Sequence, residues 1–251
     1  MLDSPKAIVV GASSGIGAAL AKALAGRGMQ VAMVARRRGE LEAQARVIND
    51  IAGRPLASAY EGDVTDYASV PALFERIVAD LGGLDLIVYA SGIMPKVGPR
   101  EYDFAKDRAI IEVNVLGAMA WLDEAAKRFE VQRGGIVIGI SSVAADRGRV
   151  GAPAYNASKA ALDTYLEALR NRLTRHGVHV LTVKPGFVRT PMLEGAKLPP
   201  LPRPISPELA ARLTLDALDR KDQVRYIPDI WRWVGLIIQL LPSPIMRRLN
   251  I

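Results

Sequence analysis

The sequence Gly11-Ala12-Ser13-Ser14-Gly15-Ile16-Gly17 lies between a short apolar run, Ala7–Val10, and a segment with alanine and leucine at helical spacing, Gly15–Arg27. A strand, a glycine-rich turn and a helix in this order are typical of a phosphate-binding turn. Glycine allows the backbone to approach a pyrophosphate, which then lies at the N-terminus of the helix. The G-x-x-x-G-x-G spacing is not the common G-x-G-x-x-G. The interpretation as a phosphate-binding turn therefore depends on the position of the turn between a strand and a helix. A tight structural turn is the alternative.

Short β-branched runs alternate with longer helical patterns along the rest of the chain. We expect strands at 7–10, 31–35, 56–60, 84–89, 135–140, 178–183 and 224–227. We expect helices at 15–27, 39–51, 69–81 and 155–175, and a long helical segment at 102–130 with room for one break. Continuous apolar strands separated by helices indicate an α/β fold with one doubly wound, Rossmann-type parallel sheet and helices on both faces. We therefore expect residues 1–251 to form a single domain.

Composition excludes several classes of protein. The 251 residues include no cysteine and two histidines, which excludes disulfides and thiolate metal sites, and we expect no metal site at all. The formal net charge of +7 favours phosphate-bearing ligands, but without basic runs interleaved with aromatic residues we expect no nucleic-acid partner. The apolar run at 7–10 leaves no room for a signal peptide, and no stretch would span a membrane, so we expect a cytoplasmic protein.

The end of the second predicted strand indicates which dinucleotide is bound. It reads Ala35-Arg36-Arg37-Arg38, with no carboxylate for a ribose 2′-hydroxyl. Arg36 offers charge-assisted contacts to a 2′-phosphate, and Ser13 adds a hydroxyl, which favours NADP(H) over NAD. The alternative is a solvated helix start. At the end of the third strand, Asp63 is placed to accept from an adenine amino group and Val64 to pack on the ring, although Asp63 also suits a turn or a helix cap.

Ser142, Tyr155 and Lys159 form the candidate reactive group. Tyr155 and Lys159 are four residues apart, on one face of a helix. An ammonium beside a phenol lowers the pKa of the phenol, so that the tyrosine works as a general acid towards a ketone or a general base towards an alcohol. Ser142 follows the fifth strand and is placed to hold the substrate oxygen.

These motifs resemble those of the classical short-chain dehydrogenase/reductase family from Gly11 to about Pro228. The resemblance also covers Asn114, Ser141-Ser142, Pro185-Gly186 and Thr190. It implies that Asn114 holds a water linking Lys159 to solvent, that Lys159 binds the nicotinamide ribose, and that the backbone around Val188 and the Thr190 side chain hold the carboxamide. Two departures are Val10, where the family has threonine, and Tyr89-Ala90-Ser91-Gly92, where it has Asn-Asn-Ala-Gly.

The predicted site therefore has two overlapping parts. The catalytic residues are Asn114, Ser142, Tyr155 and Lys159. The residues predicted to bind NADP(H) are Gly11, Ser13, Ser14, Gly15, Ile16, Gly17, Arg36, Arg37, Asp63, Val64, Ala90, Ser91, Gly92, Tyr155, Lys159, Pro185, Gly186, Val188 and Thr190.

The predicted substrate is a small hydrophobic carbonyl compound or alcohol: lipid-like, steroid-like or aromatic. The candidate lining residues are nearly all apolar: Met94, Pro95, Val143, Ala144, Val150, Pro153, Phe187, Met192 and Leu193. The charged residues near them in sequence are Lys96, Arg147, Arg149 and Glu194. The function predicted is NADP(H)-dependent interconversion of a ketone or aldehyde and an alcohol. The alternative is a non-catalytic NADP-binding regulator or a membrane-peripheral scaffold on the same fold.

Residues 229–251 extend beyond what the family core requires. This extension carries Trp231, Trp233 and an aliphatic run, and it ends with arginines. A helix packed over the cleft as a lid lined by Trp231, Leu236 and Ile237, or against a second subunit, is favoured over a helix lying on a membrane surface. The family resemblance implies a homodimer or homotetramer, with Ala160, Ala161, Tyr165, Leu166 and Leu169 supplying apolar contacts.

Overall fold

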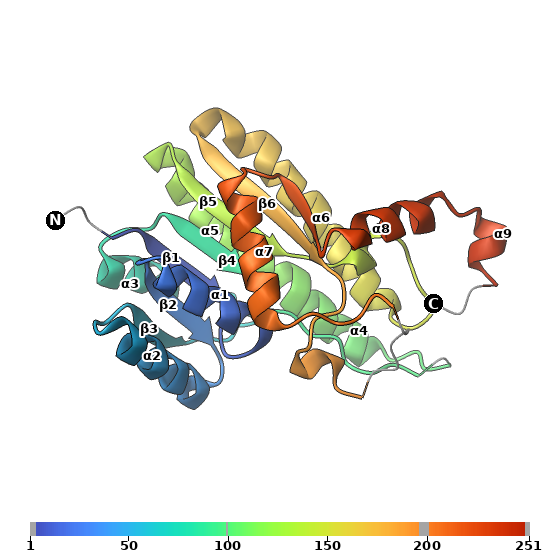
Figure 1. The fold of residues 1–251 in the computed structure, drawn as a ribbon, viewed down its shortest axis with the longest axis horizontal. Coiled ribbons are helices and arrows are strands. Elements are labelled where there is room, and N and C mark those ends of the chain that lie inside the picture. Colours follow the sequence, from blue (N-terminus) through green and yellow to red (C-terminus); the bar gives the residue numbers. More distant parts are fainter. Residues whose placement is uncertain (1–3, 99, 196–200, 249–251) are drawn as a thin grey trace.

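The computed structural model describes residues 4–98, 100–195 and 201–248, and it contains one parallel sheet (Figure 1). The order of the seven strands is β3-β2-β1-β4-β5-β6-β7. Their bounds are Lys6–Val10 (β1), Gln30–Ala35 (β2), Ala57–Glu61 (β3), Leu86–Tyr89 (β4), Gly135–Ile140 (β5), Val178–Pro185 (β6) and Val224–Ile227 (β7). All pairings are parallel, which confirms the predicted doubly wound fold.

Helices cover both faces of this sheet (Figure 1). Their bounds are Gly15–Gly26 (α1), Arg38–Ala52 (α2), Val70–Leu81 (α3), Phe104–Ile111 (α4), Gly117–Gln132 (α5), Pro153–Leu173 (α6), Pro207–Asp219 (α7), Ile230–Leu240 (α8) and Ser243–Met246 (α9). Alternate residues of β1 point to opposite faces. Ala7 and Val9 pack with α1, α2 and α7, whereas Ile8 and Val10 pack with α3, α5 and α6. This two-sided burial explains why the strands in the middle of the sheet are mainly apolar.

The long helical segment expected at 102–130 is interrupted. A π turn, Glu112–Leu116, separates α4 from α5 and carries Asn114. The wider turn aims Asn114 inward, where its side chain is fully buried. Gly117 follows this turn, and a Cβ there would lie 2.7 Å from the Tyr89 hydroxyl, so β4 and α5 approach too closely for any larger residue.

One expected role of α6 is wrong. Leu166 and Leu169 belong to the chain's own core, with Leu166 0% and Leu169 3% exposed, so they cannot supply a contact to a second subunit. Leu166 fills the space above Gly139, where a Cβ would lie 2.2 Å from it. The Tyr165 hydroxyl also has a partner within the chain, because it donates to Asp123 of α5 at 2.7 Å.

Candidate active site

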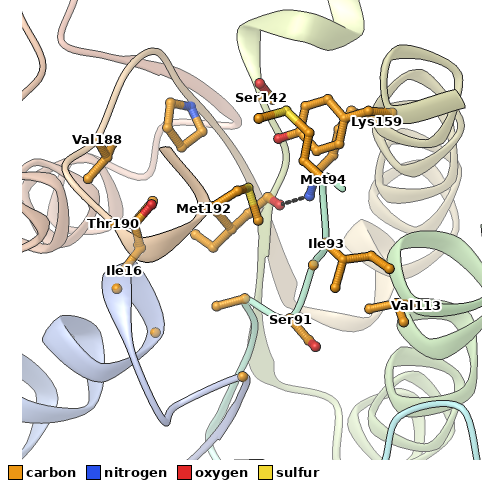
Figure 2. A pocket seen from close by; sticks show the side chains of 18 of the residues that line it. Ile16, Ser91, Ile93, Met94, Val113, Ser142, Lys159, Val188, Thr190 and Met192 are labelled. Atoms are coloured by element: carbon orange, nitrogen blue, oxygen red, sulfur yellow. Dashed lines mark hydrogen bonds between the residues drawn. The ribbon is translucent and has the colours of Figure 1, made fainter. Parts of the chain in front are cut away.

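A cavity of about 750 Å³ opens beyond the carboxyl ends of the strands and gathers most of the predicted site (Figure 2). Such a crevice is the usual ligand site of a doubly wound sheet. Apart from Asp63, every predicted cofactor-binding residue lines it, as does Ser142. The lining also includes Met94, Pro95, Val143, Ala144, Phe187, Met192 and Leu193. Val150 and Pro153 do not line it, and contribute instead to a separate hollow beside Met246 and Arg247.

The glycine turn forms a cradle that side chains would fill. Gly11 has φ +88°, and a Cβ on it would lie 2.5 Å from the backbone nitrogen of Ser91. A Cβ on Gly17 would lie 2.2 Å from the carbonyl oxygen of Gly11. The first helix begins after Ser14, which makes no side-chain cap, so the N–H groups of its first turn stay available to an anion. This arrangement fits the pyrophosphate of a dinucleotide.

The two arginines after β2 differ in their contacts. Arg37 donates to Ser13 Oγ at 2.8 Å and to Ser14 Oγ at 2.9 Å, and it also pairs with Glu40. Arg36 lines the cavity, is exposed, and has no side-chain partner among the described residues. Arg36 is therefore the guanidinium left available to a 2′-phosphate.

Asp63 stabilises a turn, which is one of the roles that its sequence position allowed. One carboxylate oxygen accepts from the Thr65 amide at 2.9 Å and from the Thr65 hydroxyl at 2.8 Å. Its neighbours Gly62 and Val64 line the cavity, but Asp63 does not. The side chain shapes the loop against which an adenine ring would pack.

Ser142, Tyr155 and Lys159 come together at the inner end of the cavity. Ser142 caps the short 3₁₀ turn Val143–Asp146, where its Oγ accepts from the Ala144 amide at 3.1 Å. Tyr155 and Lys159 lie on α6, with 9% and 4% of their surface exposed, and Lys159 Nζ is 5.8 Å from the centre of the Tyr155 ring. Figure 2 shows Ser142 and Lys159 at the same end, with Lys159 Nζ donating to the Ile140 carbonyl at 2.9 Å.

Burial dominates the electrostatics of this pair. It raises the pKa of Tyr155 above its usual value of 10.0, while a hydrogen bond with Ser142 and the charge of Arg149 act in the opposite direction. Burial lowers the pKa of Lys159 to about 8, opposed by the negative charge of Asp163. Burial thus moves the two pKa values apart, with that of Tyr155 above 10.0 and that of Lys159 at about 8, so the lowering of the phenol pKa expected from the sequence is not found.

Asn114 does not line the cavity. Its amide donates to the Ile93 carbonyl at 3.1 Å and to Ser158 Oγ at 3.0 Å, and its oxygen accepts from the Ile93 amide at 2.8 Å. It therefore joins the loop after β4 to α6. A Cβ on Gly92 would lie 3.4 Å from Asn114 Oδ1 and 3.5 Å from Lys159 Nζ, so Asn114 and Lys159 both face Gly92. Its role in holding a water stays a prediction.

Where the family has Asn-Asn-Ala-Gly, this chain lacks the asparagine amide, and the Tyr89 hydroxyl supplies a polar contact in its place. Its buried hydroxyl donates to the Val113 carbonyl at 2.6 Å, which ties β4 to the π turn. Burial raises the pKa of Tyr89, and a hydrogen bond with Ser91 opposes the shift. The sheet centre thus keeps a polar link in this chain, by way of a phenol in place of an amide.

Sequence reasoning missed a buried ionic cluster next to the site. Lys184 of β6 pairs with Asp146, and with Asp163 of α6 at 2.8 Å, and its Nζ lies 5.1 Å from the ring centre of Tyr226. The Tyr226 hydroxyl donates to Asp146 at 3.2 Å. The signal that could have indicated it is a lysine in a strand that is buried along nearly all of its length. The cluster holds the turn after Ser142 against α6, β6 and β7.

The C-terminal helix α8 packs near the site but does not line the cavity. Trp231 is buried edge-on against Phe187, with ring centres 5.1 Å apart, and a Cβ on Gly186 would lie 1.9 Å from its indole nitrogen. Arg147 donates to the carbonyls of Ile238, Gln239 and Leu241 at the end of α8. The prediction that Trp231, Leu236 and Ile237 line a lid over the cleft is therefore wrong. None of the three lines the cavity, and the last two are exposed. Residues 249–251 of this extension lie outside the described residues.

Comparisons with known proteins agree with this fold. A family model described as short chain dehydrogenase matches residues 5–199. The cis-4-hydroxycyclohexanecarboxylate dehydrogenase of Sinomonas cyclohexanicum is 33% identical over 219 residues, which cover 87% of this chain and 85% of the relative.

Solved structures are similar over nearly the whole chain. A short-chain dehydrogenase from Sphingobium yanoikuyae in complex with NADPH has TM-score 0.83 and 25% identity, and the match covers 95% of this chain and 97% of that one. A short chain dehydrogenase/reductase from Burkholderia phymatum in complex with NAD has TM-score 0.84 at 21% identity, over 93% and 92% of the two chains, and shows likeness of fold alone.

Proposed function

Because this chain belongs to the short-chain dehydrogenase family, we propose that it interconverts a ketone or aldehyde and an alcohol with NADP(H), using Tyr155 as the general acid and base. The family makes it an oxidoreductase that depends on a nicotinamide nucleotide. The proposal adds the reaction type, the choice of NADP(H) and the catalytic tyrosine. The observation that carries it is the burial of Tyr155 and Lys159 beside Ser142 in the cavity that also contains the glycine turn.

The chain's own residues supply the proton chemistry. When bound, the nicotinamide accepts or supplies the hydride. In the reducing direction, Ser142 Oγ donates a hydrogen bond to the substrate carbonyl oxygen, and Tyr155 Oη gives that oxygen a proton. Lys159, charged below a pH of about 8, stabilises the phenolate that remains. In the oxidising direction, the phenolate takes the proton of the alcohol.

The choice of NADP(H) rests on the residues after β2. The Arg36 guanidinium lines the cavity without a partner in the described part of the chain, and Ala35 offers no carboxylate to a ribose hydroxyl. Ser13 and Ser14 line the same cavity, and their hydroxyls accept hydrogen bonds from Arg37. This set of donors suits a 2′-phosphate.

The substrate end of the cavity supports a hydrophobic substrate. Met94, Phe187, Met192 and Leu193 line it with carbon and sulfur surfaces, which suit a carbon skeleton better than a sugar. The relative from Sinomonas cyclohexanicum, named for an alcohol on a six-membered ring, supports dehydrogenation at a ring CH–OH group in this chain too.

Substitution Tyr155→Phe tests the mechanism. It keeps the ring and removes the proton donor, so turnover of ketones should fall by roughly 10²–10⁴-fold while NADPH still binds. Turnover is followed by NADPH absorbance over a panel of cyclic and aromatic ketones, and cofactor affinity by fluorescence titration. Tyr102→Phe is the matched control, because Tyr102 is 97% exposed.

Two results would contradict the proposal. Activity of Tyr155→Phe within a few-fold of the parent would remove the tyrosine from the chemistry. Tight NADPH binding without turnover of any ketone or alcohol in the panel would favour a non-catalytic NADP-binding regulator.

A further inference from the structure

Arg149 is a charged residue in the cavity wall that the proposed chemistry does not use. It lies between the 3₁₀ turn after Ser142 and the start of α6, and it lines the cavity with Tyr155 and Ser142. Its Nη2 donates to the Val143 carbonyl at 3.2 Å, whereas its Nε is buried without a hydrogen-bond partner among the described residues. A guanidinium has five N–H donors, so most of the Arg149 donors make no hydrogen bond to the described residues.

The charged lining of the cavity is entirely cationic among the described residues. It consists of Arg36, Arg37, Lys159 and Arg149, with no aspartate or glutamate. Arg36 and Arg37 belong to the end proposed for the 2′-phosphate, and Lys159 to the proton relay. Arg149 is the remaining cation, and it lies near enough to Tyr155 for its charge to lower the pKa of the phenol.

The other charged residues of this region face elsewhere. Arg147 binds the carbonyls at the end of α8, and neither Lys96 nor Glu194 lines the cavity. Asp146 is the carboxylate whose charge acts on Arg149. Its Oδ1 accepts from Lys184 and Tyr226, its Oδ2 lies against Gly235 of α8 without a hydrogen-bond partner, and no ion pair joins it to Arg149 among the described residues. The Arg149 guanidinium therefore forms no ion pair with a described carboxylate, although the charge of Asp146 acts on it.

We propose that Arg149 binds a carboxylate of the substrate, which makes the substrate a hydrophobic oxo acid or hydroxy acid. This assignment rests on the proposed function and specifies the substrate class of the same site. The apolar lining would contact the skeleton between the two polar ends, with the carbonyl at Ser142 and Tyr155 and the carboxylate at Arg149.

The physical basis is the match between a guanidinium and a carboxylate. The two groups form parallel charge-assisted hydrogen bonds, which are stronger where apolar walls exclude water. Burial lowers the pKa of Arg149, yet arginine remains protonated in proteins, so the cation persists throughout the working pH range. A neutral amide offers the guanidinium one acceptor oxygen and no charge, so it should bind less tightly than the acid.

The test compares 4-acetylbenzoate with 4-acetylbenzamide, which has the same shape without the charge. With NADPH, the parent should have a higher kcat/KM for the acid. Arg149→Met should reduce kcat/KM for the acid by about 10- to 100-fold more than for the amide. Arg149→Lys keeps the charge near Tyr155 but loses the planar fork, so it should keep the parent pH profile with the amide and recover only part of the acid preference. Arg175→Met, an exposed arginine on the turn after α6, is the matched control.

A binding measurement separates this proposal from the proposed function. Calorimetry on the chain saturated with NADP⁺ should give tighter binding of 4-acetylbenzoate than of 4-acetylbenzamide, and Arg149→Met should abolish the difference. That result supports the carboxylate site even if no ketone is reduced, in which case only the proposed function fails. Equal binding of the two compounds by the parent would overturn the carboxylate site, as would an equal loss of activity towards both in Arg149→Met, which would mark a purely structural role for Arg149.

Discussion

At the scale of single residues, we predict that cofactor choice depends on Arg36, whose side chain has no partner among the described residues, whereas its neighbour Arg37 is held by Ser13, Ser14 and Glu40. Arg36→Asp places a carboxylate where a ribose 2′-hydroxyl would lie and repels a 2′-phosphate. The ratio of kcat/KM for NADPH to that for NADH should fall by roughly 100-fold or more, because charge-assisted hydrogen bonds contribute about 1.5–3 kcal/mol each.

The control for this prediction is Arg38→Asp. Arg38 is exposed, pairs with Glu42 on the first turns of α2, and does not line the cavity. Its substitution should leave the ratio unchanged. A larger change from Arg37→Asp than from Arg36→Asp would transfer the 2′-phosphate contact to Arg37.

Lys159 should give the free chain a distinctive pH dependence of stability. The folded chain releases this proton at a pH of about 8, whereas the ordinary pKa of lysine is 10.5, so between these values the unfolded chain binds more protons. The free energy of unfolding of the parent should therefore rise with pH between about 8 and 10, by about 2–3 kcal/mol relative to Lys159→Met. Urea unfolding of both proteins at several pH values measures the difference, and parallel pH curves would contradict the assignment.

At the scale of elements, the ionic cluster around Lys184 joins β6, α6 and β7 to the turn after Ser142. Lys184→Met leaves Asp146 and Asp163 close together without their cation. Removing one partner of a buried ion pair typically costs about 3–5 kcal/mol, and urea unfolding should show a loss of this size.

Two further variants test whether this cluster stabilises the fold. Lys184→Met combined with Asp146→Asn and Asp163→Asn should recover part of the loss, because no uncompensated carboxylate remains. Lys127→Met removes an exposed lysine paired with Glu124 and should change the free energy of unfolding by less than about 1 kcal/mol. A loss no larger in Lys184→Met than in Lys127→Met would show that the cluster does not hold the site.

At the scale of the whole molecule, the outer face of α8 is a continuous apolar surface. Trp233 is 61%, Ile237 62% and Leu240 73% exposed, on the side opposite the buried Trp231 and Gly235. None of the described helices combines the length and hydropathy needed to cross a membrane. Exposed apolar surfaces of this kind are commonly interfaces, and we expect a second copy of the chain to cover this one.

Substituting Trp233, Ile237 and Leu240 together by glutamine should lower the mass measured by analytical ultracentrifugation and leave the cavity intact. The matched control replaces Val131 and Ile51 by glutamine, since these are exposed apolar residues on other helices. Co-sedimentation of the parent, but not the triple variant, with anionic vesicles at unchanged mass would assign this face to a membrane surface instead.

Local sequence patterns alone determined the sheet, the glycine turn and the candidate reactive residues. The apolar runs and helical spacings specified parallel strands in alternation with helices, because a strand buried on both faces must be apolar throughout. Gly11 and Gly17 could be recognised because only glycine permits such close backbone approach. The spacing of Tyr155 and Lys159 placed them on one helical face before any contact was known.

Contacts between distant segments decided the rest. Only the folded chain shows that Arg147 reaches α8 while Arg149, two residues later, lines the cavity and the hollow next to it, since the direction of a loop side chain follows no sequence period. The pairing of Lys184 with two aspartates joins strand and helix residues that no local pattern connects. Leu166, expected to face a second subunit, is buried because Gly139 leaves room for it, and that space depends on how α6 lies across the sheet.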